Sequence, residues 1–154
     1  MEILNTTPDQ EIITQRVFNF PIDLIYQAFA NPNHLKIWWG PKGFTNTFNT
    51  FEFKPGGKWS FIMHGPDKGN YVNECVFIIV EKNNLIVWDR LSNPIFYVIV
   101  QFQEISESKT KIIFRQLFAS VELCNKIKLH TVGKNDENFD RLEIELTKMR
   151  KDLK

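Results

Sequence analysis

The chain has 154 residues, 43% of them hydrophobic and 24% charged, which is the size and balance of one globular domain with a substantial core. Its formal net charge is only +1, from 19 basic and 18 acidic residues, which argues against nucleic acid as the main partner because such binders carry a clustered basic surplus. No stretch resembles a secretory leader or approaches the roughly 20 apolar residues of a membrane-spanning helix, so we expect a cytoplasmic protein that does not insert into membranes.

The first quarter of the chain predicts a strand followed by two short helices. β-Branched and aromatic residues fill 11–20, and Pro21 ends this strand while suiting the first turn of a helix. Apolar residues at helical spacing follow until Asn31-Pro32-Asn33 breaks the pattern. A second short helix is expected over about 33–38, and Gly40-Pro41 stops it.

The rest of the chain predicts a sheet and a closing helix. Six runs rich in Val, Ile, Phe, Tyr and Trp are separated by turn-prone residues, as in an antiparallel meander: 44–54, 57–64, 70–81, 84–91, 95–105 and 109–119. Residues 121–130 are expected to be helical, and 134–153 shows the period of an amphipathic helix with Asn135 or Asp136 as its cap. We therefore predict a single α+β domain, residues 1–154, in which a seven-stranded curved antiparallel sheet with two short helices wraps around a long C-terminal helix.

Alternation along the strands predicts which side chains face that helix. In 95–105 one face is uniformly apolar, with Phe96, Val98, Val100 and Phe102. The same rule groups Trp59, Phe61 and Met63; Cys75, Phe77 and Ile79; and Thr110, Ile112, Phe114, Gln116 and Phe118. Aromatic residues make up 14% of the chain, so this face is either a densely filled core or a cavity lined by rings with a polar group such as Gln116, Asn73 or His64.

Two aromatic segments beside backbone-breaking residues carry a family resemblance: Trp38-Trp39-Gly40-Pro41 and Pro55-Gly56-Gly57-Lys58-Trp59. With Arg16-Val17-Phe18, Asn31-Pro32-Asn33-His34-Leu35, Phe51-Glu52-Phe53 and Met63-His64-Gly65-Pro66-Asp67, the chain resembles the family related to the C-terminal domain of the activator of the heat-shock-protein-90 ATPase. That family belongs to the START-like, birch-pollen-allergen-like superfamily. The resemblance implies a helix-grip fold with a pocket, whereas the role differs among lipid carriers, hormone receptors, polyketide cyclases and co-chaperone domains.

Motifs for catalysis or metal binding are not apparent in the sequence. The three histidines, His34, His64 and His130, are widely separated, and neither a GxSxG elbow nor a phosphate-binding glycine loop occurs. Cys75 and Cys124 lie far apart and are expected to be reduced thiols. We therefore expect no metal, no cofactor and no assigned catalytic residue. The acid–base groups that a cavity would have to enlist are Glu52, Glu74, Asp89 and His64, with Arg90 able to neutralise a carboxylate.

Three functions of different classes remain open. The preferred one is a module that binds an apolar or amphipathic small molecule, lipid-like or aromatic, between the sheet and the C-terminal helix. Its expected lining is Trp38, Trp39, Phe44, Trp59, Phe61, Met63, Phe77, Val100, Phe102, Phe114, Gln116, Phe139 and Leu142. The second, implied by the resemblance, is a chaperone-associated interaction protein of the stress response. The third is a cyclase-type or hydrolase-type enzyme that uses the same cavity, and a monomer or homodimer is expected in each case.

Overall fold

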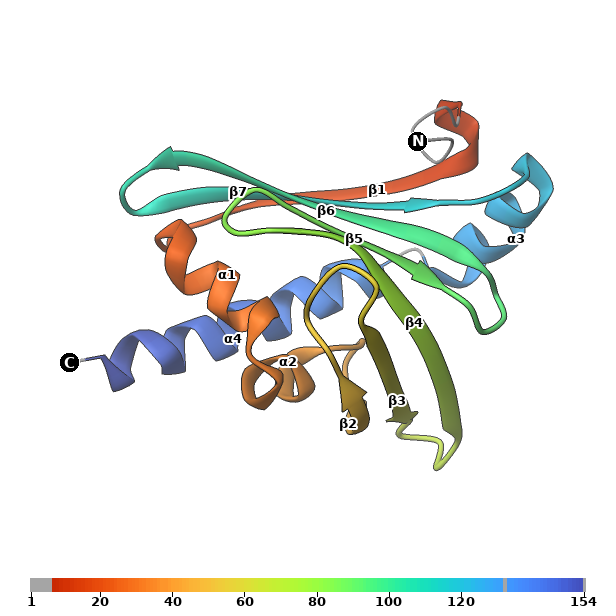
Figure 1. Cartoon of the computed structure of the whole chain (residues 1–154), viewed down its shortest axis with the longest axis horizontal. Coiled ribbons are helices and arrows are strands. Elements are labelled where there is room, and N and C mark those ends of the chain that lie inside the picture. The colour runs from red at the N-terminus through yellow and green to blue at the C-terminus, as the bar shows by residue number, and fades with distance from the viewer. Residues whose placement is uncertain (1–6, 132, 154) are drawn as a thin grey trace.

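The computed structural model describes residues 7–131 and 133–153, which form one seven-stranded antiparallel sheet and four α-helices (Figure 1). In chain order the elements are η2 (Pro8–Gln10), β1 (Glu11–Phe18), α1 (Ile22–Ala30), α2 (Pro32–Trp38), β2 (Thr45–Phe51), β3 (Lys58–His64), β4 (Asn70–Glu81), β5 (Leu85–Arg90), β6 (Phe96–Ser106), β7 (Lys109–Leu117), α3 (Val121–Thr131) and α4 (Lys134–Asp152). The strand order is β1-β7-β6-β5-β4-β3-β2. The predicted α+β helix-grip architecture is thus confirmed. The expectation that the chain has no secretory leader concerns residues 1–6 in part, and these lie outside the described residues.

The long helix α4 lies along the concave side of the sheet, where α1 and α2 also pack (Figure 1). The half of the sheet formed by β2, β3 and β4 bends away from the other strands and curls around the helix. The apolar side of α4, with Phe139, Leu142 and Leu146, is fully buried in the main core. Burial of this stripe, more than helix propensity, holds α4 in place.

Local sequence explains how α1 and α2 are joined. The carbonyl of Pro21 accepts the first bonds of α1, from the amides of Leu24 and Ile25 at 3.1 and 3.2 Å. Asn31 ends α1 and caps α2, because its side-chain oxygen accepts a bond from the Asn33 amide at 2.9 Å. The helix therefore begins at Pro32, slightly earlier than predicted, since proline suits the first helical position.

The start of α4 differs from the prediction. Gly133 occupies the N-cap position with φ of +83°, a left-handed conformation that glycine adopts without a Cβ penalty, and no side chain caps the helix. Asn135 and Asp136 lie inside the first turn, so the predicted cap is wrong. This placement leaves the Asn135 side chain available to contact the sheet.

Strand alternation predicted the inward side chains correctly except at one bulge. Trp59 and Phe61 on β3, and Phe102 and Phe114 on β6 and β7, are buried in the core as expected. In β4 the pairing with β5 shifts between Phe77 and Ile79, so Ile79 pairs with the outward Val87 and leaves the core face. The prediction that Ile79 faces inward is therefore wrong. It belongs instead to a small apolar cluster on the other face, built on Val87, Ile99 and Leu117.

The Pro55-Gly56-Gly57 turn joins β2 to β3 and packs against β4. The Gly56 amide donates to the Phe77 carbonyl at 2.7 Å, and the Phe77 amide donates to the Gly57 carbonyl at 2.9 Å. A Cβ atom on Gly57 would overlap the carbonyl oxygen of Glu52, whereas one on Gly56 would meet no atom within 4 Å. Gly57 is thus required by a close backbone approach, and this turn fixes where Trp59 enters the core.

Candidate functional site

A cavity of about 140 Å³ lies between the concave face of the sheet, the start of α4 and the connection that follows α2. Its walls come from the inward residues of five strands, the first two turns of α4, and the loop 39–41. The lining residues are Trp39, Gly40, Pro41, Phe61, Met63, Asn73, Cys75, Trp88, Arg90, Phe96, Val98, Phe114, Gln116, Asn135 and Asn138. Rings and polar groups therefore line the same space, which is the usual composition of a small-molecule site.

Aromatic rings form the apolar wall. Trp39 meets Trp88 edge to face with ring centroids 5.7 Å apart, and it also contacts Phe114 at 6.1 Å. Phe61 lies beside these rings and stacks on Trp59 at 4.4 Å. These edge-to-face, tilted and stacked contacts orient the rings, which form an apolar wall of the cavity.

Arg90 and Asn73 form a polar wall at the ends of β5 and β4. The Asn73 side chain is only 1% exposed, and its oxygen accepts a hydrogen bond from Nη1 of Arg90. Two backbone carbonyls of the following turn accept the other bonds of this guanidinium, Ser92 from Nε at 3.2 Å and Asn93 from Nη2 at 3.1 Å. The guanidinium carbon also lies 5.5 Å from the centre of the Phe96 ring, a cation–π contact. Burial lowers the pKa of Arg90, although the group remains charged at any physiological pH.

Cys75 lies on the same wall, paired with Arg90 across β4 and β5. Burial raises the pKa of its thiol to about 12, against a smaller opposing effect of the Arg90 charge. The group is therefore a neutral thiol at neutral pH.

This pKa predicts an unreactive Cys75. At pH 8 we expect its folded-state reaction with a disulfide reagent to be roughly a thousand-fold slower than that of an exposed thiol, because a raised pKa keeps the thiolate fraction low. The measurement is the rate of Ellman's reagent with Cys124→Ala, which leaves Cys75 as the single thiol, in buffer and in denaturant. Rapid labelling of the folded protein would contradict the burial of Cys75.

Amide side chains form the opposite polar wall, at the start of α4. Asn135 donates to Gln116 Oε1 at 2.9 Å and to the Thr14 hydroxyl at 3.2 Å, which ties the helix to β7 and β1. Asn138 is buried, and its oxygen accepts a bond from the Gly40 amide at 3.2 Å. The side-chain oxygens of Gln116 and Asn138 therefore both accept hydrogen bonds from the protein itself.

The loop 39–41, which covers the cavity, is held down by α4. Arg141 donates through Nη1 to the carbonyls of Trp39, Gly40 and Pro41 at 3.1, 2.9 and 3.0 Å, and through Nη2 to that of Ile37 at 2.6 Å. Gly40 has φ of +100°, and a Cβ there would lie 2.8 Å from the Met63 side chain. The glycine thus lets the chain turn closely over the cavity.

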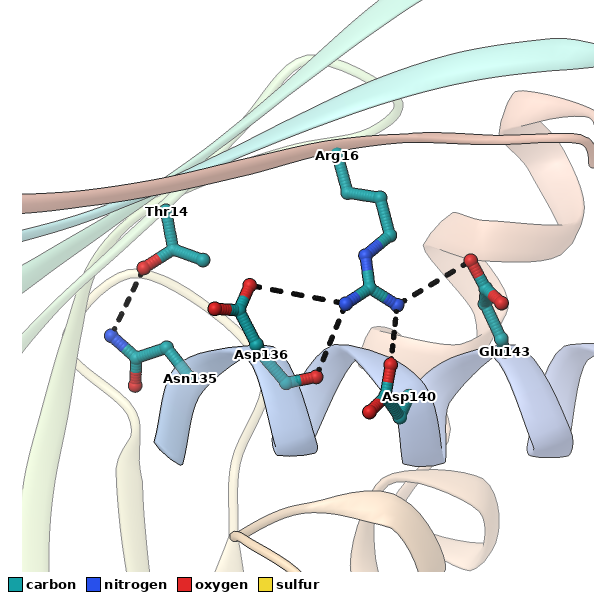
Figure 2. A network of polar contacts seen from close by, with 6 residues as sticks. All are labelled: Thr14, Arg16, Asn135, Asp136, Asp140 and Glu143. Carbon is teal, nitrogen blue, oxygen red and sulfur yellow. Dashed lines mark hydrogen bonds and ion pairs between the residues drawn. The ribbon is translucent and has the colours of Figure 1, made fainter. Parts of the chain in front are cut away.

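A second arginine fastens the first half of α4 to β1. Figure 2 shows Arg16 extending from β1 between three carboxylates of the helix, with the Asn135 contact to Thr14 beside it. Its nitrogen atoms lie 2.9 Å from Asp140, 3.5 Å from Glu143 and 3.9 Å from Asp136. The same guanidinium donates to the Asp136 carbonyl at 3.2 Å. Because the three acidic side chains are partly exposed, each pair contributes modestly, and the cluster acts mainly by orienting the helix.

The structure distributes the thirteen predicted lining residues over three places. Trp39, Phe61, Met63, Phe114 and Gln116 line the cavity. Phe44 is half-buried and contacts Tyr71, away from the lining. The others are buried in the surrounding core: Trp38, Trp59, Phe77, Val100, Phe102, Phe139 and Leu142. Within the Trp pair, Trp38 is anchored in the core by a bond from its indole nitrogen to the Ala28 carbonyl at 2.9 Å, and Trp39 faces the cavity.

The lining also contains residues outside the predicted set. Trp88, Phe96, Val98 and Cys75 occupy inward strand positions, and Arg90, Asn135 and Asn138 add polar side chains to the lining. Asn73, one of the three polar groups predicted for such a cavity, does line it. His64 points to the other side of β3, where its ring bonds to Thr47 at 2.8 Å and Asn70 at 2.6 Å.

The other acid–base groups named from the sequence also lie away from the cavity. Glu74 accepts from the Ser60 hydroxyl at 2.9 Å, and Glu52 accepts from the Lys58 amide at 3.0 Å, both at exposed positions. Asp89 pairs with Tyr97 on the strand face opposite Arg90, and burial raises its pKa. Within the described residues, the cavity lining holds no carboxylate or imidazole, and no three His, Cys, Asp or Glu side chains gather as a metal site.

No helix in 7–131 or 133–153 is both long and apolar enough to cross a bilayer.

A curved antiparallel sheet wrapped around a long helix, with a cavity between them, defines a helix-grip domain of the ligand-binding type. The pattern of the family described as Activator of Hsp90 ATPase homolog 1-like protein matches residues 19–147, and the chain belongs to this family. No curated protein matches the chain in sequence.

Solved structures share the fold at low sequence identity. A protein from Nitrosomonas europaea superposes with a TM-score of 0.84 at 16% identity, covering 94% of this chain and 98% of its own. Proteins from Arthrobacter aurescens and Mycobacterium smegmatis give TM-scores of 0.83 and 0.81, each at 20% identity. The alignments cover 91% and 92% of this chain, and 87% and 93% of those proteins. At such identities the likeness shows the fold alone.

Proposed function

We propose that the protein binds a small amphipathic molecule, about the size of one substituted aromatic ring, in the cavity between the sheet and α4. The observation that carries this proposal is the lining itself, in which aromatic rings face one another and two polar walls close the ends. Such a space takes an apolar body and fixes its orientation through a few polar contacts.

The volume supports a ring-sized ligand over a long acyl chain. The cavity of about 140 Å³ is close to the engineered cavity of about 150 Å³ that binds benzene, and well below the roughly 300–1,000 Å³ of pockets for larger ligands. A lipid chain would require the core to open. The absence of carboxylate and imidazole groups from the described lining favours binding over acid–base catalysis.

Filling the cavity tests this proposal. Val98 lines it and is 1% exposed, so Val98→Phe should place a ring in the space and abolish binding of a probe such as benzyl alcohol. Val98→Ile adds a single methylene at the same position and should weaken binding only a few-fold. For the unchanged protein we expect a Kd of about 0.1–1 mM, typical of a ligand with few atoms.

Binding is measured by titration of amide chemical shifts in two-dimensional NMR spectra, which also report whether each variant is folded. Shift changes should concentrate on residues of β4 to β7 and on the loop 39–41. If neither benzyl alcohol nor another ring-sized probe shifts these signals, or if Val98→Phe binds as well as the unchanged protein, the proposal fails.

A further inference from the structure

Arg90 is a cation built into the cavity wall. It stands at the end of β5, where its partners in the sheet are Cys75 on β4 and Phe96 on β6, and all three residues line the cavity. The inward side chains of β5 are Ile86, Trp88 and Arg90 in alternation. The side chain is thus directed by strand geometry and then held by its bonds to Asn73, Ser92 and Asn93.

No protein carboxylate neutralises this charge. Among the described residues Arg90 forms no ion pair, whereas Arg16 and Arg115 pair with carboxylates. The nearest acidic residues along the strands are Asp89, which precedes Arg90, and Glu74, which precedes its pairing partner Cys75, and both lie on the opposite faces of their strands. The partners of Arg90 are a neutral amide and two carbonyls, and they use only part of the donor capacity of a guanidinium. A partly buried cation without a carboxylate partner is stabilised when a ligand places an anionic group beside it.

Most of the other polar side chains of the cavity offer donors rather than free acceptors. Of the four lining amides, three have oxygens that already accept protein hydrogen bonds, that of Asn73 from Arg90, that of Gln116 from Asn135 and that of Asn138 from Gly40. The Asn135 oxygen is the one lining amide oxygen with no donor among the described residues. The amide nitrogens of Gln116 and Asn138 have no acceptor among the described residues. A ligand therefore meets donors on both polar walls, which suits a group that only accepts hydrogen bonds.

From these observations we infer that the cavity selects an anionic ligand, of the class of small aromatic carboxylates, whose carboxylate binds Arg90 while its ring lies against Trp39, Trp88 and Phe114. This inference rests on the proposed function and adds the charge of the ligand to it. An arginine that presents paired N–H groups matches the two oxygens of a carboxylate, so the interaction is directional as well as electrostatic.

The test compares three ligands of nearly equal shape and different charge: benzoate, benzamide and benzylamine. In the unchanged protein at pH 7 we expect benzoate to bind at least ten-fold more tightly than benzamide, and benzylamine, a cation, not to bind detectably. Arg90→Met should weaken benzoate at least ten-fold and change the Kd of benzamide by less than about three-fold. Arg115→Met is the matched control, because Arg115 also projects from a strand but pairs with Glu11 at 2.8 Å, outside the cavity lining.

The outcomes separate the two proposals. Equal affinities for benzoate and benzamide, or loss of both in Arg90→Met with its fold retained, would overturn the anion preference and leave the ring-binding cavity standing. If neither these three ligands nor benzyl alcohol binds the unchanged protein, both proposals fail, and if benzyl alcohol alone binds, only the anion preference fails. Should Arg90→Met not fold, the ligand series in the unchanged protein and in Arg90→Lys, which keeps the charge but loses the paired geometry, still decides the question.

Discussion

Replacing Gly57 with alanine is expected to lower the free energy of unfolding by about 3 kcal/mol, the largest loss we predict for one added methyl group. The new Cβ would overlap the carbonyl oxygen of Glu52, and backbone cannot move aside as the end of a long side chain can. The turn would have to open, which would weaken its two bonds to Phe77 and displace Trp59 from the core. Urea unfolding should show a lower midpoint with an unchanged slope.

The neighbouring glycine provides the control. Gly56 has φ of +82°, and a Cβ there would meet no atom within 4 Å. Gly56→Ala should therefore lower the free energy of unfolding only by the cost of placing alanine in a left-handed conformation, about 1 kcal/mol. Equal losses in the two variants would show that the close approach at Gly57 is relieved at little cost.

Replacing Arg141 with methionine is expected to cost about 2–3 kcal/mol and to loosen the loop over the cavity. The side chain donates to four carbonyls between Ile37 and Pro41. The other side-chain bonds between α4 and this loop among the described residues are donated by the loop, from the Gly40 amide to Asn138 and from the Lys42 amide to Glu137. The apolar part of Arg141 is retained by methionine, so the loss reports mainly on hydrogen bonds. Hydrogen exchange should accelerate at residues 39–44 more than in the strands.

Lys148→Met, at an exposed position of the same helix, is the comparison for Arg141→Met. It should change the free energy of unfolding by less than about 0.5 kcal/mol and leave exchange in the loop as it was. If Arg141→Met exchanged like this control, the arginine would not be what holds the loop over the cavity.

The fold was predictable because each level of the sequence points to the same arrangement. Turn residues divide the strands, a helical period marks 134–153, and alternation in β6 and β7 separates the two faces of the sheet. The β4 bulge was not predictable, because Ile78 and Ile79 are both apolar and fit either face. A one-residue insertion reverses every later side chain of a strand, and only the pairing with β5 reveals it.

The aromatic residues of the site were predictable from the sequence, whereas its charged residue, Arg90, was not. Aromatic residues on inward positions indicated an apolar space, although only part of the predicted set borders it. Residues of β5 are apolar on both faces, so alternation gives no sign that Arg90 points inward. Its direction follows from the register of the sheet, in which Arg90 pairs with Cys75 on β4 and with Phe96 on β6. This register could not be derived from the sequence of β5 alone. Chaperone association, a role in stress, a cytoplasmic location and a monomeric or homodimeric state stay predictions.

Three tryptophans meet beside the cavity, and this gives the protein an optical property. The rings of Trp39, Trp59 and Trp88 form a triangle with centroid separations of 5.4, 5.7 and 5.3 Å and inclined planes. Transition dipoles at such separations and angles couple, so their absorption bands split with opposite circular dichroism. Two of the three rings border the cavity, and a ligand that shifts Trp39 by a small angle alters the coupling. We therefore expect the circular dichroism spectrum of the unmodified chain to change when a ligand moves Trp39, without an added label.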